Sequence, residues 1–187
     1  METVKLDDVV RNSRARKKVV EAMITGKIFI YPTDTIYGIG CNAMDSDVVR
    51  RIRELKGSSH PFSVIVPSKG WIKQWLFAKN DFLKKLPGPY TLILRKKNPD
   101  FLNEVSSLDS LGIRIPRHVF SELVCEAGIP FITTSVNILG QKPVVRTEEI
   151  PEPMRKAADF IIDGGVLNNR PSKVIDLTSG KPMILRE

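Results

Sequence analysis

The sequence predicts an α/β fold: a twisted, mostly mixed β-sheet with flanking helices. Short apolar runs, typical of buried strands, alternate along the chain with segments whose apolar residues recur at helical spacing. Thirteen prolines mark turns throughout the chain. Strands interleaved with helices in this way are typical of a sheet that helices cover on its faces.

The helical segments have apolar residues three or four positions apart and suitable residues at their ends. Gly26 and Gly57 follow two of them at the position of a C-terminal cap. Trp71 and Trp75 either stack on a nucleic-acid base or pack into the core, and a core-facing stripe is the favoured interpretation. The expected helices are residues 13–25, residues 46–56, the segment around residues 71–77 and residues 119–127.

The strands are expected to be short, and Pro32 stops the first of them. No low-complexity linker and no repeat divides the chain, so residues 1–187 are expected to form one domain. The expected strands are residues 27–31, 63–66, 90–94, 112–115, 131–134, 160–162 and 173–177, with 183–185 as a weaker case.

The chain carries 29 basic and 21 acidic residues, a formal charge of +8. This charge predicts a positive field that attracts anions such as nucleotide phosphates or RNA. For each short basic run alone, a solvated helix face or strand end is the favoured interpretation. No apolar stretch is long enough to cross a membrane, and no signal segment begins the chain. A cytoplasmic protein without a membrane partner is therefore expected.

The cysteines and histidines argue against several kinds of site. Cys41 and Cys125 form no CxxC pair, so neither a disulfide framework nor a zinc site is expected. His60 and His118 have no clustered ligands around them, and any metal is expected to arrive with a phosphate. Walker, dinucleotide-binding and metalloprotease motifs are absent. The expected chemistry is positioning and charge stabilisation without a covalent enzyme intermediate.

Polar side chains follow a predicted strand in residues 31–38, where the chain enters a turn with Thr33, Asp34 and Thr35. Ligands of open α/β sheets bind beyond the carboxyl ends of strands, so this turn is a candidate site. An ordinary turn in which Asp34 or Thr35 caps backbone amides is an equally good interpretation of this segment alone.

Arg114 stands inside the apolar run of residues 112–115, and it needs a partner because burying an unpaired charge is costly. A ligand carboxylate or phosphate is the favoured partner, and an internal salt bridge is the alternative. Residues 133–137 and Ser172 add polar groups at two other strand ends. Lys56, at a helix end, either matches the helix dipole or reaches nucleotide phosphates.

Five segments resemble, in order, the hallmark blocks of YrdC-like threonylcarbamoyl-adenylate synthases: YPTDTIYGIG, LPGPYTLIL, GIRIPRH, TTSVN and PSKVIDL. The resemblance covers the chain from about Val19 to Arg186. It implies a single YrdC-like domain whose sheet surrounds a deep, positively charged concave site. It also implies a nucleotidyltransferase that forms threonylcarbamoyl-AMP from L-threonine, bicarbonate or CO₂ and ATP, releases pyrophosphate and serves tRNA threonylcarbamoyladenosine modification.

The resemblance further implies roles for individual residues. The guanidinium of Arg114 suits the threonine carboxylate, and Lys56 and Arg114 are the residues implied in catalysis. Mg²⁺ carried by ATP is implied as the ion that neutralises the departing pyrophosphate, with no metal site of the protein itself. The residues implied at threonine are Thr35, Arg114, Thr133 and Ser172, and those implied at ATP are Lys56, Ser110, Ser135, Asn137 and Arg186.

The sequence departs from the family pattern after Lys56. The family carries an arginine two residues on, where this chain has Ser58 in a shortened segment. Arg53, Lys56 or His60 is expected to replace that arginine near the phosphates, with Lys56 as the first candidate. Two alternatives stay open: a YciO-like nucleotide-binding protein without synthase activity, and a module that binds double-stranded RNA or tRNA. The downstream proteins that transfer the threonylcarbamoyl group do not follow from the sequence.

Overall fold

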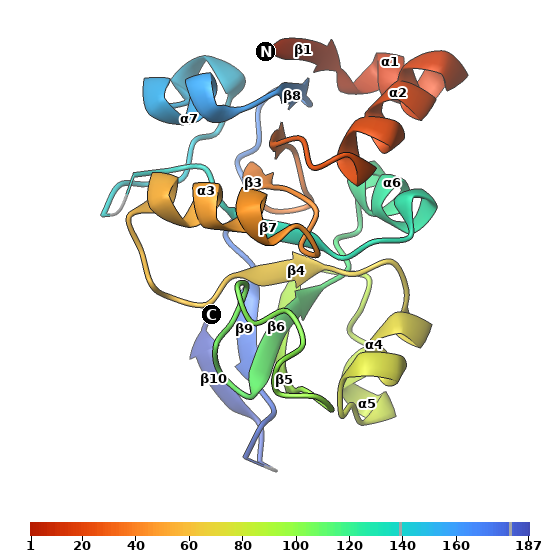
Figure 1. Cartoon of the computed structure of the whole chain (residues 1–187), viewed down its shortest axis with the longest axis vertical. Helices are drawn as coiled ribbons and strands as arrows, with labels where there is room; N and C mark the ends of the chain where they lie inside the picture. Colours follow the sequence, from red (N-terminus) through yellow and green to blue (C-terminus); the bar gives the residue numbers. More distant parts are fainter. Residues whose placement is uncertain (139, 180) are drawn as a thin grey trace.

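The computed structural model describes residues 1–138, 140–179 and 181–187, and these residues form one mixed ten-stranded sheet (Figure 1). The strand order is β1-β8-β2-β3-β7-β4-β6-β5-β9-β10, with both parallel and antiparallel neighbours. The predicted fold class is confirmed. The strands are β1 (Glu2–Lys5), β2 (Phe29–Tyr31), β3 (Gly38–Gly40), β4 (Ser63–Ile65), β5 (Tyr90–Arg95), β6 (Ser110–Arg114), β7 (Phe131–Ser135), β8 (Phe160–Asp163), β9 (Lys173–Asp176) and β10 (Met183–Arg186).

The predicted helices are present, with ends set by local chemistry. In α3, Asp45 accepts a hydrogen bond from the backbone N–H of Val48 at the start, and Gly57 ends the helix in the left-handed region at φ 56°. The helices are α1 (Leu6–Arg11), α2 (Ser13–Ile24), α3 (Ser46–Lys56), α4 (Lys69–Trp75), α5 (Asn80–Leu83), α6 (Val119–Ala127) and α7 (Glu152–Ala157), with a short 3-10 helix η1 (Thr147–Glu149).

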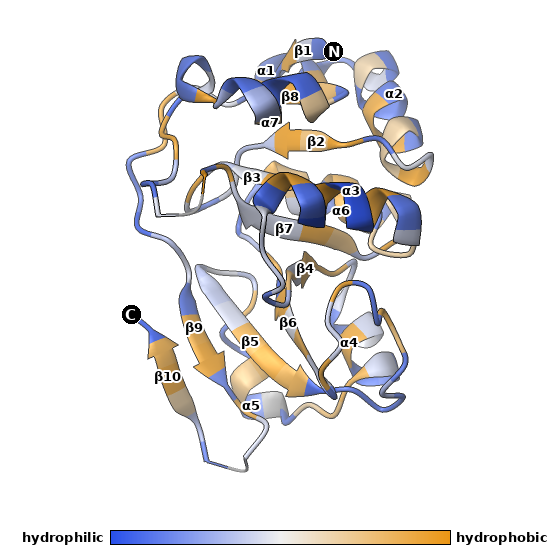
Figure 2. Ribbon diagram, turned by 60° about the vertical axis from the view of Figure 1, so that its left-hand side comes forward, coloured by the Kyte–Doolittle hydropathy of each residue, from blue (hydrophilic) through white to orange (hydrophobic). Residues whose placement is uncertain are grey.

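Helices cover both faces of the sheet. Successive side chains of a strand point to opposite faces, so an apolar strand has side chains to bury on each face. In β2, Phe29 and Tyr31 pack with α2 and α6, whereas Ile30 packs in the cluster that includes the apolar side of α3. The ring of Tyr31 stacks on Phe120 of α6 with a centroid distance of 3.7 Å. Figure 2 shows the hydrophobic residues concentrated on strands such as β2 and β5, while α3 carries many hydrophilic residues.

Trp71 and Trp75 belong to the core, as favoured from the sequence. The Trp75 ring stacks on Phe101 at 4.2 Å between centroids, and both tryptophans are half-buried against the main hydrophobic cluster. None of the helices in the described ranges has the length and apolar character needed to cross a bilayer. The number of domains stays a prediction.

The basic run of residues 14–18 makes several contacts within the chain. Arg16 pairs with Glu122 and Glu126, and Lys18 pairs with Glu2. These contacts agree with the interpretation of solvated helix faces rather than a nucleic-acid groove.

Candidate active site

A cleft of about 160 Å³ opens where β5, β6, β7, β10 and the residue before β9 bring polar side chains together. Arg114 and Ser135 are the last residues of β6 and β7, and Ser172 stands just before β9. The wall of the cleft includes five residues of the predicted site: Arg114, Thr133, Ser135, Ser172 and Arg186. The expected concave site is therefore present, and strand ends far apart in sequence build it.

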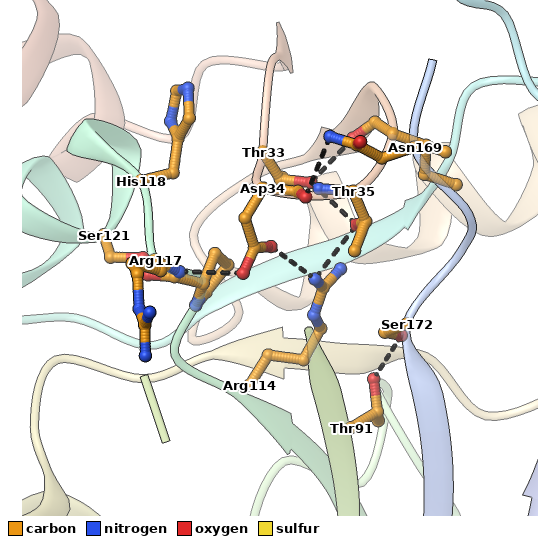
Figure 3. Close-up of polar contacts among 12 residues, drawn as sticks. Thr33, Asp34, Thr35, Thr91, Arg114, Arg117, His118, Ser121, Asn169 and Ser172 are labelled. Atoms are coloured by element: carbon orange, nitrogen blue, oxygen red, sulfur yellow. Dashed lines mark hydrogen bonds and ion pairs between the residues drawn. The ribbon is translucent and has the colours of Figure 1, made fainter. Parts of the chain in front are cut away.

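Arg114 is 6% exposed and its guanidinium is held from one side (Figure 3). Its Nη2 donates to Asp34 Oδ1 and to Thr35 Oγ1, both at 3.0 Å. The other oxygen of Asp34 accepts from the backbone N–H of Arg117 at 2.9 Å. The internal salt bridge considered from the sequence is thus present, and Asp34 fixes the direction of the Arg114 side chain.

Part of the same guanidinium makes no hydrogen bond with the described residues. Arg114 Nε is buried and has no hydrogen-bond partner among the described residues. Burial lowers the pKa of Arg114 despite the attraction of Asp34, so the environment leaves this cation short of compensating contacts. Buried donors are normally paired. The internal salt bridge is therefore confirmed, and an oxyanion as a further partner of Arg114 stays a prediction.

Thr35 lies behind Arg114 rather than in the cleft wall, and it is 1% exposed. The Thr33 hydroxyl donates to the Ile36 carbonyl at 2.8 Å and accepts from the Thr35 N–H at 3.1 Å. The segment is therefore a capped turn, in which Thr33 rather than Thr35 caps the local amide and Asp34 accepts from the more distant amide of Arg117. The same turn orients Arg114. Direct contact between Thr35 and threonine stays a prediction.

Ser172 and Arg186 form the other side of the cleft. Arg186 Nε donates to the Ser172 carbonyl at 2.8 Å, and its Nη2 donates to Ser172 Oγ at 3.0 Å. Burial lowers the pKa of Arg186 as well. Two guanidinium groups, from Arg114 and Arg186, therefore face one hydroxyl-lined space, which suits an anionic ligand.

Tyr37, which follows the turn of residues 33–36, forms hydrogen bonds with the segment before Ser172. Its hydroxyl donates to the Gly165 carbonyl at 2.7 Å and accepts from the Gly164 N–H at 3.0 Å. Burial raises the pKa of Tyr37 to about 12, so this donor keeps its proton at neutral pH. The sequence analysis did not single out Tyr37, although it lies inside the YPTDTIYGIG block.

A second pocket of about 200 Å³ adjoins the cleft and shares Pro61, Phe62, Thr134 and Ser135 with it. Lys56 and Asn137 line this pocket together with Ser58 and His60. The site predicted from the sequence therefore continues from the cleft into this pocket.

The Lys56 ammonium is already bound to the end of β7. Its Nζ donates to the Ser135 carbonyl at 2.9 Å, the Asn137 carbonyl at 2.7 Å and Asn137 Oδ1 at 3.1 Å. An ammonium has three donors, so all are used. Burial lowers the pKa of Lys56. Lys56 thus positions Ser135 and Asn137 and adds positive charge, but direct donation to a phosphate requires that it exchange one of these bonds.

A protein-family model described as "Telomere recombination" (Sua5_yciO_yrdC) matches residues 21–187. The chain belongs to the Sua5/YciO/YrdC family. A Methanocaldococcus jannaschii protein provisionally named as a threonylcarbamoyl-AMP synthase is 35% identical, over 94% of this chain and 88% of its own length. Escherichia coli YciO is 30% identical, and its crystal structure has a TM-score of 0.81 with coverage of 93% of this chain and 89% of that chain.

A crystal structure of Pyrococcus abyssi Sua5 complexed with L-threonine has a TM-score of 0.84 and 28% identity. The match covers 98% of this chain and 56% of that one, so this chain spans little more than half the length of that Sua5 protein. The synthase relatives and YciO are thus similar to this chain to about the same degree.

The family arginine missing at Ser58 is not replaced by Arg53. Arg53 donates to the carbonyls of Ser58, His60, Glu104 and Val105, and its guanidinium lies 4.5 Å from the centroid of the Phe62 ring. It lines neither pocket. Arg53 therefore fixes the shortened segment whose residues form the wall between the two pockets.

Ser110 does not join the other members of the predicted site. It is the first residue of β6 and Arg114 is the last, so the length of the strand separates them. Ser110 lines neither pocket, and its carbonyl accepts from Ser106 Oγ at 2.8 Å. The structure gives no contact between Ser110 and the cleft, and its role at ATP stays a prediction.

The residues in the described ranges include no group of three or more His, Cys, Asp or Glu side chains arranged to hold a metal. The donor groups around the two pockets are hydroxyls, carbonyls and cations. Mg²⁺ carried by ATP stays a prediction.

Proposed function

We propose that this chain is a threonylcarbamoyl-AMP synthase that uses L-threonine, bicarbonate or CO₂, and ATP. The observation that carries the proposal is the buried guanidinium of Arg114, which lines the cleft, pairs with Asp34 through Nη2 and keeps an Nε–H without a partner among the described residues. The family membership and the relatives named for this activity support it.

The Arg114 guanidinium binds the threonine carboxylate in this proposal, since a planar fork suits a planar oxyanion. Asp34 and Thr35 hold the guanidinium in place before the substrate arrives, which lowers the cost of ordering it on binding. Thr133 and Ser172 supply hydroxyls beside the same group. The threonine amine is then left to face the adjoining pocket.

The proposed reaction begins when the threonine amine adds to CO₂ and loses a proton, which gives a carbamate. A carbamate oxygen attacks the α-phosphorus of ATP, and the bond from that phosphorus to pyrophosphate breaks. Arg186 and Lys56 provide positive charge near the phosphates without a covalent enzyme intermediate. Mg²⁺ bound to ATP would neutralise charge on the departing pyrophosphate.

Bicarbonate as the carbon source, a cytoplasmic location, and passage of the product to a tRNA-modifying complex are further parts of this proposal. Direct binding of tRNA is a weaker part, because several basic residues that suggested it are engaged with acidic side chains.

Pyrophosphate release from ATP tests the proposal when threonine and bicarbonate are each omitted in turn. Release that requires both is expected. Release that requires neither would indicate a nucleotide-hydrolysing protein. Calorimetric binding of ATP without binding of threonine would favour a YciO-like nucleotide-binding protein.

Lys56→Ala is expected to weaken ATP binding about tenfold, because it removes a charge and frees the end of β7. Ser58→Arg is expected to strengthen ATP binding, because it restores the family cation in the adjoining pocket. Calorimetry with ATP measures both changes. Full ATP affinity in a folded Lys56→Ala variant would show that Lys56 does not serve the nucleotide.

A further inference from the structure

Thr91 on β5 has no role in the site predicted from the sequence, yet it lies in the cleft wall. Its side chain is 4% exposed, and its Oγ1 is 2.8 Å from Ser172 Oγ (Figure 3). Leu92 lies opposite Ile113 where β5 and β6 pair as antiparallel strands. Thr91 precedes Leu92 and Arg114 follows Ile113, so Thr91 and Arg114 are neighbours across the two strands. The Thr91 hydroxyl therefore belongs to the floor between the two guanidinium groups.

The hydrogen bonds of Ser172 leave two arrangements open. Its hydroxyl can donate one hydrogen bond and accept two. The guanidinium of Arg186 can only donate, so the 3.0 Å contact from its Nη2 fills one acceptor position of Ser172 Oγ. If Thr91 donates to Ser172, the second acceptor position is filled and the Ser172 proton is left for a ligand. If Ser172 donates to Thr91, that proton is used within the protein.

The protein alone does not decide between these arrangements, because either hydroxyl can be the donor. Among the described residues, Ser172 Oγ is the hydrogen-bond partner of Thr91 Oγ1. In either arrangement one of the two hydroxyl protons is left without an acceptor in this pair, and both residues line the cleft. An oxyanion that contacts Ser172 favours donation from Thr91, because the oxyanion can accept from Ser172 but cannot donate to it.

We propose that Thr91 is a positioning residue, which donates to Ser172 and so directs the Ser172 hydroxyl proton toward an oxyanion of the substrate. The inference rests on the proposed function and deepens it. Two substrate groups have the required chemistry, the carboxylate of threonine and a phosphate of ATP. Binding experiments with each substrate alone distinguish them.

A double-mutant cycle tests the role of Thr91, with Thr91→Val, Ser172→Ala and the double variant compared with wild type. Calorimetry measures the binding of L-threonine and of α,β-methylene-ATP separately. Thr91→Val keeps the shape of the side chain and removes its hydroxyl. We expect it to weaken one of the two ligands about fivefold to tenfold, the scale of one hydrogen bond to a charged group.

The same substitution is expected to add less than about a twofold change when Ser172 is already alanine, because Thr91 acts through Ser172. In pyrophosphate release, Thr91→Val should raise the KM of the affected substrate more than it lowers kcat. Thr91→Ser restores the hydroxyl and should bind within about twofold of wild type. Thr178→Val removes a threonine hydroxyl beyond the other end of β9, where it bonds to Asp176, and should change neither ligand.

Three results would overturn the role of Thr91. The first is a loss of ligand affinity in Thr91→Val that is equal in the presence and absence of the Ser172 hydroxyl, and the second is a loss in Thr91→Ser as large as that in Thr91→Val. The third is an unchanged affinity of Thr91→Val for both ligands. Thermal melting of each variant shows whether the chain is folded. If wild-type protein binds neither ligand, the proposed function fails and this inference fails with it. Wild-type binding together with additive losses removes only the role of Thr91.

Discussion

Arg114→Ala is expected to weaken L-threonine binding by about 2–4 kcal/mol, the scale of losing a charge-assisted contact in a desolvated site. ATP binding should weaken less, because Lys56 and Arg186 remain. Calorimetry with each substrate measures the two effects. Arg114→Lys keeps a positive charge beside Asp34 but loses the Nε donor, so its affinity for threonine should fall between those of wild type and Arg114→Ala.

Arg117→Ala is the matched control for this experiment. Its side chain is exposed, and the contact of residue 117 with Asp34 comes from the backbone N–H, which alanine keeps. Threonine affinity close to wild type is expected. Unchanged threonine affinity in a folded Arg114→Ala variant would remove Arg114 from the binding site.

Asp34→Ala is expected to lower the free energy of unfolding by about 3–5 kcal/mol, because it leaves Arg114 buried without its carboxylate. The side chains of Arg114 and Asp34 are 7% and 11% exposed, so water compensates for little of the loss. Urea unfolding measures the change.

The double variant Asp34→Ala/Arg114→Met should recover part of this stability, since it removes the unpaired charge as well. Asp81→Ala is a suitable control, because the pair of Asp81 with Lys84 is exposed and should contribute less than about 1 kcal/mol. A double variant as unstable as Asp34→Ala would mean that the turn itself, rather than the buried charge, depends on Asp34.

Much of the fold could be predicted because long elements carry strong periodic patterns. Residues 119–127 form α6 with the predicted ends, and the predicted helix of residues 13–25 differs from α2 by one residue. The missed elements are short. Glycine occupies two of the three positions of β3, so no apolar run marks it, and β1 has only four residues at the sheet edge. Such strands depend on neighbours that pair with them rather than on their own residues.

Most residues of the candidate site could be predicted from the sequence, but the hydrogen bonds between them could not. Arg114, Ser172 and Arg186, which the resemblance implies at the site, line one cleft. The pairing of Arg114 with Asp34 could not be read from the sequence, because it depends on how the end of β6 meets the turn of residues 33–36. The bonds of Lys56 to Ser135 and Asn137 also depend on tertiary structure, since they join the end of a helix to a strand far along the chain.

The wide sequence separation of the cleft residues has a consequence for how the chain folds. Arg114, Ser135 and Ser172 meet only after β4 to β7 and β9 have paired, and several of these strands are not neighbours in sequence. Pairing of distant segments is slow, so folding of this chain should be slow for its size. A ligand that needs the completed cleft cannot bind the unfolded chain, and at a hundred times its Kd it adds about 2.7 kcal/mol to stability. Bound substrate therefore stabilises the folded chain against unfolding and proteolysis.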